Sequence, residues 1–170
     1  KTHLLALAPI HIEPIGLYAG KSKDLKNIKN GATIAIPNDA TNGGRALLLL
    51  QSAGIIQLKK GTGINATKAD IVSNPHNVKL QELEAAQIPR SLKDVDFAVI
   101  NSNFALTVNL NPVKDALFIE DSKSPYANYL VVRQGDENRP EIQKLVKALQ
   151  SPEVKEYIDK NLKGAVVAAF

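Results

Sequence analysis

The segment Thr33 to Leu50, TIAIPNDATNGGRALLLL, constrains the fold of this chain more than any other segment. The continuous apolar stretch from Ala32 to Pro37 is typical of a strand covered on both faces. A polar turn follows, and the leucine-rich stretch from about Asn42 to Ser52 predicts a helix that stops at Gly54, a residue suited to the position beyond a helix C-terminus. A strand followed by a short turn and a helix is the first half of a βαβ unit.

The start of this helix has the features of an anion-binding site. The first N–H groups of a helix have no partner inside it, and either Asn42 or Thr41 can cap this one. Gly43 and Gly44 have no side chains that would block the approach of a ligand. We therefore expect a small anionic group to bind near this turn.

Arg45 lies in the first turn of the predicted helix. A cation there opposes the helix dipole at a cost of roughly 0.3–1 kcal/mol, so a negative group is expected beside it. A guanidinium can hold a ligand carboxylate bidentately, which the ammonium of lysine cannot do. The alternative is that Arg45 pairs with a protein acid such as Asp39 or Glu84.

The composition excludes several classes of protein. The 170 residues, 44% hydrophobic and 22% charged, suffice for one substantial core or two small lobes. Basic and acidic residues number 21 and 17 and are spread along the chain, and aromatic residues make up only 5%, which argues against a nucleic-acid surface and for a solvated, lysine-rich one. The sequence has no cysteine, its three histidines lack the spacing of metal ligands, and no apolar run approaches the ~20 residues of a membrane span. No cofactor or metal is expected.

The rest of the chain alternates strand and helix patterns. Strands are predicted at Leu4–Ala8, Ile10–Tyr18, Val78–Glu84, Asp96–Ile100, Ala116–Glu120 and Tyr126–Arg133, and helices at Ser91–Val95, Asn103–Val108, Glu141–Gln150 and Pro152–Leu162. Ser22–Asn30 is predicted to be a short helix or a turn, and Thr67–Asp70 to open a short helix with a capping box. This order predicts an α/β fold with a mainly parallel sheet.

Polar residues follow three of the predicted parallel strands. Asn38 and Asp39 follow the first, Glu84 to Ala86 the second, and Asn101 the third. Ligands of such sheets bind outside the carboxyl ends of the strands, so these polar groups are expected to converge on one edge.

Acid–base machinery is absent from this pattern. There is no nucleophile elbow and no phosphate-binding loop, and the acid pairs Glu82/Glu84 and Glu120/Asp121 are interpreted as solvated faces or strand ends. An enzyme is therefore the weaker interpretation, and turnover assays would decide it.

Three further polar residues are candidates for ligand binding. His11 and Glu13 share one face of an extended segment, where they could bond each other or a ligand ammonium. Asparagine is disfavoured in strands, so Asn101 at a strand end and Asn128 within YANYLVVR mark either turns or bulges, or a binding role. Because an amide can accept from an ammonium and donate to a carboxylate, these two residues could form a zwitterion clamp with Arg45.

Five segments resemble, in order and spacing, the NlpA/MetQ family of methionine-binding lipoproteins. They are APIHIEPIGLY, TIAIPNDATNGGRALLLL, LEAAQIPRSL, DFAVINSNFAL and DSKSPYANYLVVR. The resemblance implies a type II periplasmic-binding-protein fold, with residues 1–18 as a crossing strand and part of lobe 1, residues 19–125 as a complete lobe 2, and residues 126–170 as the returning strand and C-terminal helices of lobe 1.

The resemblance also implies a function. It predicts an extracytoplasmic receptor, lipid-anchored at the periplasmic or cell-surface side, that captures methionine, a related amino acid or a methionyl dipeptide and delivers it to the permease and ATPase of an ABC importer. Arg45 would bind the ligand carboxylate, and Asn101 and Asn128 would hold the carboxylate and ammonium ends. His11 is carried over as a further ligand-binding residue, while Asn42 either contributes or only caps the helix.

The chain departs from the family at its start. Family members begin with a signal peptide, a lipid-modified cysteine and a half-lobe that lines the methionine side-chain pocket, whereas this sequence starts KTHLLALAPIHIEP. We expect a processed or truncated product. Either the upstream part has been removed, or a complementary N-terminal fragment or a second copy of the chain completes the fold. Strand edges and apolar helix faces of lobe 1 would otherwise be exposed. The chain alone is expected to bind methionine weakly or not at all.

One alternative from another class remains. The same two-lobe fold also serves as the effector-binding module of transcription regulators. A lipobox in the encoded upstream sequence would support transport, and a helix-turn-helix would support regulation.

Overall fold

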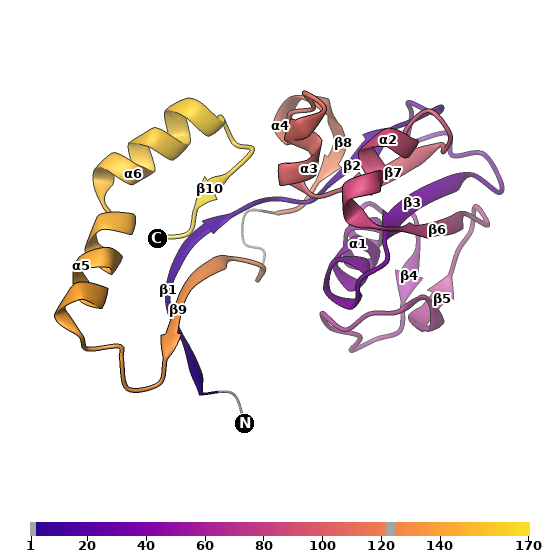
Figure 1. Ribbon diagram of the computed structural model, residues 1–170. Coiled ribbons are helices and arrows are strands. Elements are labelled where there is room, and N and C mark those ends of the chain that lie inside the picture. The colour runs from indigo at the N-terminus through magenta and orange to yellow at the C-terminus, as the bar shows by residue number, and fades with distance from the viewer. Residues whose placement is uncertain (1–2, 122–124) are drawn as a thin grey trace. The chain divides into compact units, whose positions relative to one another are not determined.

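The computed structural model describes residues 3–121 and 125–170, and the chain divides into two compact units (Figure 1). Unit 1 comprises Lys1–Pro14 and Asp121–Phe170, and unit 2 comprises Ile15–Glu120. The strand β2 (Gly16–Ala19), which the sequence analysis divided between its first two ranges, lies wholly in unit 2.

Unit 2 is built on a mixed five-stranded sheet. Its strand order is β6 (Lys79–Leu83), β3 (Thr33–Pro37), β7 (Phe97–Ile100), β2 and β8 (Ala116–Ile119). β3 pairs in parallel with β6 and β7, whereas β2 runs antiparallel to both of its neighbours, β7 and β8. β8 therefore shares the direction of β6, β3 and β7, and only β2 runs the other way. The α/β fold with a mainly parallel sheet is confirmed.

Helices lie on both faces of this sheet. They are α1 (Ala40–Ser52), α2 (Ile88–Ser91), α3 (Ser102–Thr107) and α4 (Pro112–Asp115), with one-turn 3₁₀ helices at Lys68–Asp70 (η1) and Ala85–Gln87 (η2) and a small second sheet of β4 (Gln57–Leu58) and β5 (Ile71–Ser73). The capping box predicted at Thr67 and Asp70 is confirmed. Ser22–Asn30, which the sequence predicted to be a short helix or a turn, is a loop that contains turns and no helix.

The alternation of residues along the strands creates two cores. On β3, Ile34 and Ile36 pack on one face with Leu50 of α1, and Ala35 packs on the other face. The second core includes Ile88 of α2 and Tyr18 of β2, where burial, with a contribution from the Asp115 carboxylate, raises the pKa of the phenol. Side chains of successive strand residues point to opposite faces, so a strand apolar throughout is explained by cover on both sides.

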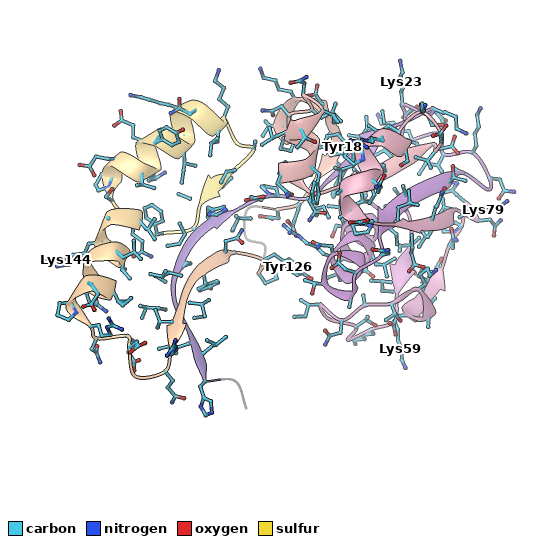
Figure 2. The ribbon with its side chains drawn as sticks, viewed as in Figure 1. Tyr18, Lys23, Lys59, Lys79, Tyr126 and Lys144 are labelled. Carbon is cyan, nitrogen blue, oxygen red and sulfur yellow. The ribbon has the colours of Figure 1, made fainter. Side chains whose placement is uncertain are left out.

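Lysine side chains of unit 2 lie on its solvated surface. In Figure 2 the side chains of Lys23, Lys59 and Lys79 point away from unit 2, while Tyr18 lies inside it. Lys144 of unit 1 likewise projects from its helix. This agrees with the interpretation of the net positive charge as a dispersed surface property.

Unit 1 has a smaller, antiparallel sheet. β1 (Leu4–Ile12) lies between β9 (Asn128–Arg133) and the short β10 (Val167–Ala168). The ladder between β1 and β9 is irregular around Pro9, a residue that cannot donate to a ladder. The helices α5 (Pro140–Leu149) and α6 (Pro152–Tyr157) follow β9, and a π-helical turn, η3 (Ile158–Leu162), extends α6.

Candidate functional site

The carboxyl edge of the large sheet brings together polar residues from distant parts of unit 2. Because β3, β7 and β8 run in the same direction, Asp39, Asn101 and Glu120 leave the sheet at the same edge. The predicted convergence of the groups after β3 and β7 is confirmed. The sheet adds Glu120 to them, a residue interpreted from the sequence as a solvated strand end.

Helix α1 begins earlier than the sequence predicted. Its N-cap is Asp39, whose carboxylate accepts from the backbone N–H of Asn42 at 2.9 Å, so the prediction that Asn42 or Thr41 caps the helix is wrong. The side chain of Asn42 donates to both oxygens of Asp39, at 3.2 and 3.1 Å. A helix that starts at Ala40 places Arg45 in its second turn, where the dipole penalty that motivated the anion prediction has faded.

Arg45 is nevertheless bound to an anion, and that anion belongs to the protein. Its Nε lies 2.9 and 3.2 Å from the two carboxylate oxygens of Glu120, and its Nη2 donates to Oε2. Only 8% of the Arg45 side chain and 14% of the Glu120 side chain are exposed. The alternative prediction, that Arg45 pairs with a protein acid, is therefore confirmed. The acid is Glu120, and not Asp39 or Glu84 as suggested from the sequence.

Asn101 and Asn42, both predicted site residues, are in direct contact. Nδ2 of Asn101 donates to Oδ1 of Asn42 at 2.8 Å. Oδ1 of Asn101 is buried and has no hydrogen-bond partner within the described part of the chain. Asn42 precedes Arg45 by three positions on α1, so the two share a helix face.

Gly43 and Gly44, which the sequence analysis placed in the turn, lie within α1 and are explained by close packing against the backbone. A Cβ at Gly44 would lie 2.7 Å from the carbonyl oxygen of Ile64, and one at Gly43 would lie 3.0 Å from that of Pro37. The same region encloses a cavity of about 360 Å³ whose walls include Gly43, Gly44 and Leu47. None of the five residues predicted to bind ligand lines this cavity.

Unit 1 holds the other two predicted residues. Nε2 of His11 lies 3.0 Å from Oε1 of Glu13, so the bond suggested by their spacing is formed. Asn128 is the exposed first residue of β9 and lies directly opposite His11 in the antiparallel ladder, next to an irregularity. The interpretation of Asn128 as a residue at a bulge thus agrees with the ladder, and strand pairing brings the two residues together.

Glu120 is the residue that sequence reasoning missed. Its position at the end of a predicted strand was visible, but the strand order was not. Without knowing that β8 shares the direction of β3, no spacing in the sequence places Glu120 at the edge that holds Arg45.

The described residues contain neither a candidate metal site nor a helix that could span a membrane. In residues 3–121 and 125–170, no group of three or more His, Asp or Glu side chains could hold a metal ion. No helix in those ranges has the length and apolar character needed to cross a bilayer.

Comparisons with known proteins connect this geometry to one family. The profile of the NlpA lipoprotein family matches residues 1–170. The D-methionine-binding lipoprotein MetQ of Salmonella typhimurium is 45% identical over 169 residues, which are 98% of this chain and 62% of that protein. Outer membrane lipoprotein 3 of Mannheimia haemolytica is 41% identical over 167 residues, 98% of this chain and 64% of that protein. The chain thus spans less than two thirds of the length of these relatives.

Solved structures that superpose on this chain include substrate-binding proteins. A nutrient binding protein from Burkholderia cenocepacia bound to methionine superposes with a TM-score of 0.92 at 52% identity, covering 99% of this chain and 71% of that one. A periplasmic substrate-binding protein of an ABC transporter from Coxiella burnetii gives 0.90 at 45% identity, covering 99% and 71%. The architecture of this chain is therefore that of part of a periplasmic substrate-binding protein.

Proposed function

The chain belongs to the NlpA lipoprotein family, and on that premise we propose that it recognises methionine as part of an extracytoplasmic substrate-binding protein. Its ligand is methionine, a closely related amino acid or a methionyl dipeptide, and the whole protein delivers that ligand to an ABC importer. The names of its relatives support this proposal, since they include methionine-binding lipoproteins and a periplasmic component of an ABC transporter. The relatives are not described as enzymes, and we propose no catalytic activity.

The observation that carries the proposal is the buried guanidinium of Arg45 at the carboxyl edge of the sheet. Ligands of such sheets bind at this edge, and Arg45 is held there in a fixed orientation. In this proposal Arg45 binds the ligand carboxylate, because a charge-assisted hydrogen bond to a guanidinium offsets the cost of removing a carboxylate from water.

The amides around Arg45 complete the polar part of the proposed site. Asn101 offers a buried acceptor oxygen to the ligand ammonium, and Asn42 orients the Asn101 amide through the 2.8 Å hydrogen bond. Asn128 and His11 of unit 1 are proposed as further ligand-binding residues on the strength of their pairing opposite each other in the ladder. Burial of the thioether side chain of methionine would add roughly 2–3 kcal/mol.

The proposed location follows from the relatives, which are lipoproteins. We propose that the whole protein acts outside the cytoplasm, at the periplasmic or cell-surface side, held by a lipid anchor. No observation in the described residues favours the alternative role in a transcription regulator.

Calorimetry tests the proposal with two proteins. One is the 170-residue chain, and the other is a chimera in which this chain replaces the matching segment of the Salmonella relative. L-methionine, D-methionine and a methionyl dipeptide are titrated, with leucine as the comparison ligand. The chimera is expected to bind at least one methionine ligand in preference to leucine, and absence of binding by both proteins would contradict the proposed function.

The variant Arg45→Ala tests the role of the guanidinium. Loss of a charge-assisted contact is expected to weaken methionine binding at least about tenfold. Arg90→Ala, which removes an exposed arginine of α2 in the same unit, serves as the matched control and is expected to leave affinity unchanged. Unchanged affinity in Arg45→Ala would refute the role of Arg45.

A further inference from the structure

The Arg45–Glu120 pair presents one positive and one negative group, whereas a site built on Arg45 alone would present only a positive one. The guanidinium and the carboxylate are both largely buried, and they neutralise each other inside unit 2. An incoming group with only a negative charge would meet a cation that is already compensated, and would also face the carboxylate of Glu120. An incoming zwitterion brings one charge for each partner.

Glu120 is held in place from two sides. Its carboxylate Oε2 accepts from the backbone N–H of Ile15 at 3.3 Å, in addition to Arg45. Its own N–H donates to the carbonyl of Ile15 at 3.0 Å, which continues the ladder between β2 and β8. The backbone therefore fixes where Glu120 stands, independently of Arg45.

The carboxylate of Glu120 retains capacity to accept another hydrogen bond. A carboxylate offers about four lone-pair sites. Among the described residues, Oε1 accepts only from Nε of Arg45, whereas Oε2 accepts from Arg45 and Ile15. Oε1 is thus the oxygen with the greater remaining capacity to accept a hydrogen bond.

The sheet register places a second acceptor on the other side of Ile15. Gly16 of β2 lies opposite Ile100 of β7 and Ile119 of β8, so the residues that follow, Asn101 and Glu120, flank the same strand. Neighbouring strands are about 4.8 Å apart, which separates the two backbones by roughly 10 Å. Oε1 of Glu120 and the unpartnered Oδ1 of Asn101 are thus two acceptors at the same edge of the sheet, and an ammonium can donate to both.

We propose that Glu120 is a specificity-determining residue of the methionine site. It accepts from the ligand ammonium while Arg45 binds the ligand carboxylate, so that the pair selects zwitterionic amino acids over carboxylates of the same shape. This inference rests on the proposed function. A residue that only oriented Arg45 would affect every carboxylate ligand alike, and that difference separates the two roles.

The test compares methionine with 4-(methylthio)butanoate, which has the same side chain and carboxylate but no ammonium. Calorimetry on the 170-residue chain and on the chimera gives the affinity ratio of the two ligands for the parent protein and for Glu120→Gln. The parent is expected to prefer methionine. Glu120→Gln is expected to lower that preference at least about tenfold, because methionine loses a charged acceptor and the other ligand loses a repulsion.

Two further variants keep the test interpretable. Glu120→Asp retains the charge and is expected to retain the preference for methionine at reduced affinity. Glu82→Gln removes an ion-paired glutamate from the end of another strand of the same sheet, where Lys68 is its partner, and is expected to leave the ratio unchanged. Circular dichroism confirms that each variant is folded before it is titrated.

The possible outcomes distinguish the role of Glu120 from the proposed binding of methionine. A preference ratio that Glu120→Gln leaves intact, or a parent protein that binds both ligands equally, would overturn the role of Glu120 while methionine binding stands. Proportional weakening of both ligands would also overturn it, since that result is expected of a group that only holds Arg45. Failure of both parent proteins to bind methionine would instead overturn the proposed function.

Discussion

The two units of this chain bury their apolar residues to very different extents. Unit 2 packs apolar side chains on both faces of one sheet, and many of them are fully buried. Unit 1 has few buried apolar residues in its described part, and its amphipathic helix α5 has none. Both units expose some large apolar side chains, and those of the smaller unit 1 include Leu4, Leu5, Tyr129, Val131, Leu145 and Tyr157.

This difference shows which part of the chain supplies its own stability. Hydrophobic burial is the main favourable contribution to folding, so unit 2 is expected to unfold as a cooperative structure, and unit 1 to open at a lower cost. The expectation that lobe 1 exposes apolar helix faces agrees with the exposure of these residues. The amphipathic period of α5 predicts an apolar face but does not show what covers that face.

The largest expected effect comes from matched isoleucines in the two units. Ile34 is completely buried in unit 2, and Ile158 is 6% exposed in unit 1. We expect Ile34→Ala to cost about 4 kcal/mol and Ile158→Ala about 2 kcal/mol, because a densely surrounded site leaves the larger cavity. Urea unfolding followed by circular dichroism measures both values. Equal costs would show that unit 1 is packed as tightly as unit 2.

The next effect concerns the buried ion pair of unit 2. Arg45→Leu leaves the largely buried carboxylate of Glu120 without its main partner and is expected to cost about 3 kcal/mol. The double variant Arg45→Leu/Glu120→Leu removes both charges and should recover most of that loss. Urea unfolding of the parent, the single variants and the double variant measures the coupling. If the costs of the two single variants simply add, the pair is not energetically coupled.

The same pair shows how far the sequence could predict the site. Helix α1, its strand and the edge where polar groups converge follow from apolar runs, glycine and local patterns. The cap at Asp39 was missed because several cap-forming residues occur in succession, and local preference does not choose among them. Glu120 was missed for a different reason: its contact with Arg45 spans 75 positions in sequence and depends on the strand order.

The fold was predictable to a similar degree. The apolar strands β3 and β7 were placed within one residue, since burial on both faces produces a continuous apolar run in the sequence. The elements β4, β10 and α4 were not predicted. Their existence depends on neighbours that are distant in sequence.

A smaller effect tests how closely the backbone of unit 2 is packed. A Cβ at Gly20 would lie 2.3 Å from the carbonyl oxygen of Val95 and 2.6 Å from that of Leu92. Gly20→Ala is therefore expected to cost about 2 kcal/mol, since backbone atoms must move to admit it. Gly63→Ala is the control, because a Cβ there meets no atom within 4 Å. Thermal unfolding measures both, and a neutral Gly20→Ala would mean that this end of β2 is loosely held.

The smallest expected effect is a pH dependence that distinguishes the acids of unit 2 from those of unit 1. In unit 2, Asp96 accepts from the N–H and hydroxyl of Thr33 at 2.8 and 3.1 Å and from the hydroxyl of Ser22 at 3.0 Å. The backbone N–H of Thr33 makes the largest contribution to lowering the pKa of Asp96 below its ordinary value. In unit 1, acids such as Asp159 form exposed ion pairs, which contribute little to stability.

The sign of the dependence follows from the direction of that pKa shift. A carboxyl with a lowered pKa in the folded state stabilises the fold fully above its unfolded pKa of about 3.9, and the contribution is lost as the pH falls through the folded value. Asp96→Asn is expected to cost about 1 kcal/mol near pH 7, the size of a net hydrogen bond, and progressively less below pH about 4. Urea unfolding at a series of pH values gives this difference, with Asp94→Asn as the control for an exposed neighbouring acid. A cost that stayed constant down to pH about 2, below the ordinary range of aspartate, would show that the charge of Asp96 does not hold the start of β3.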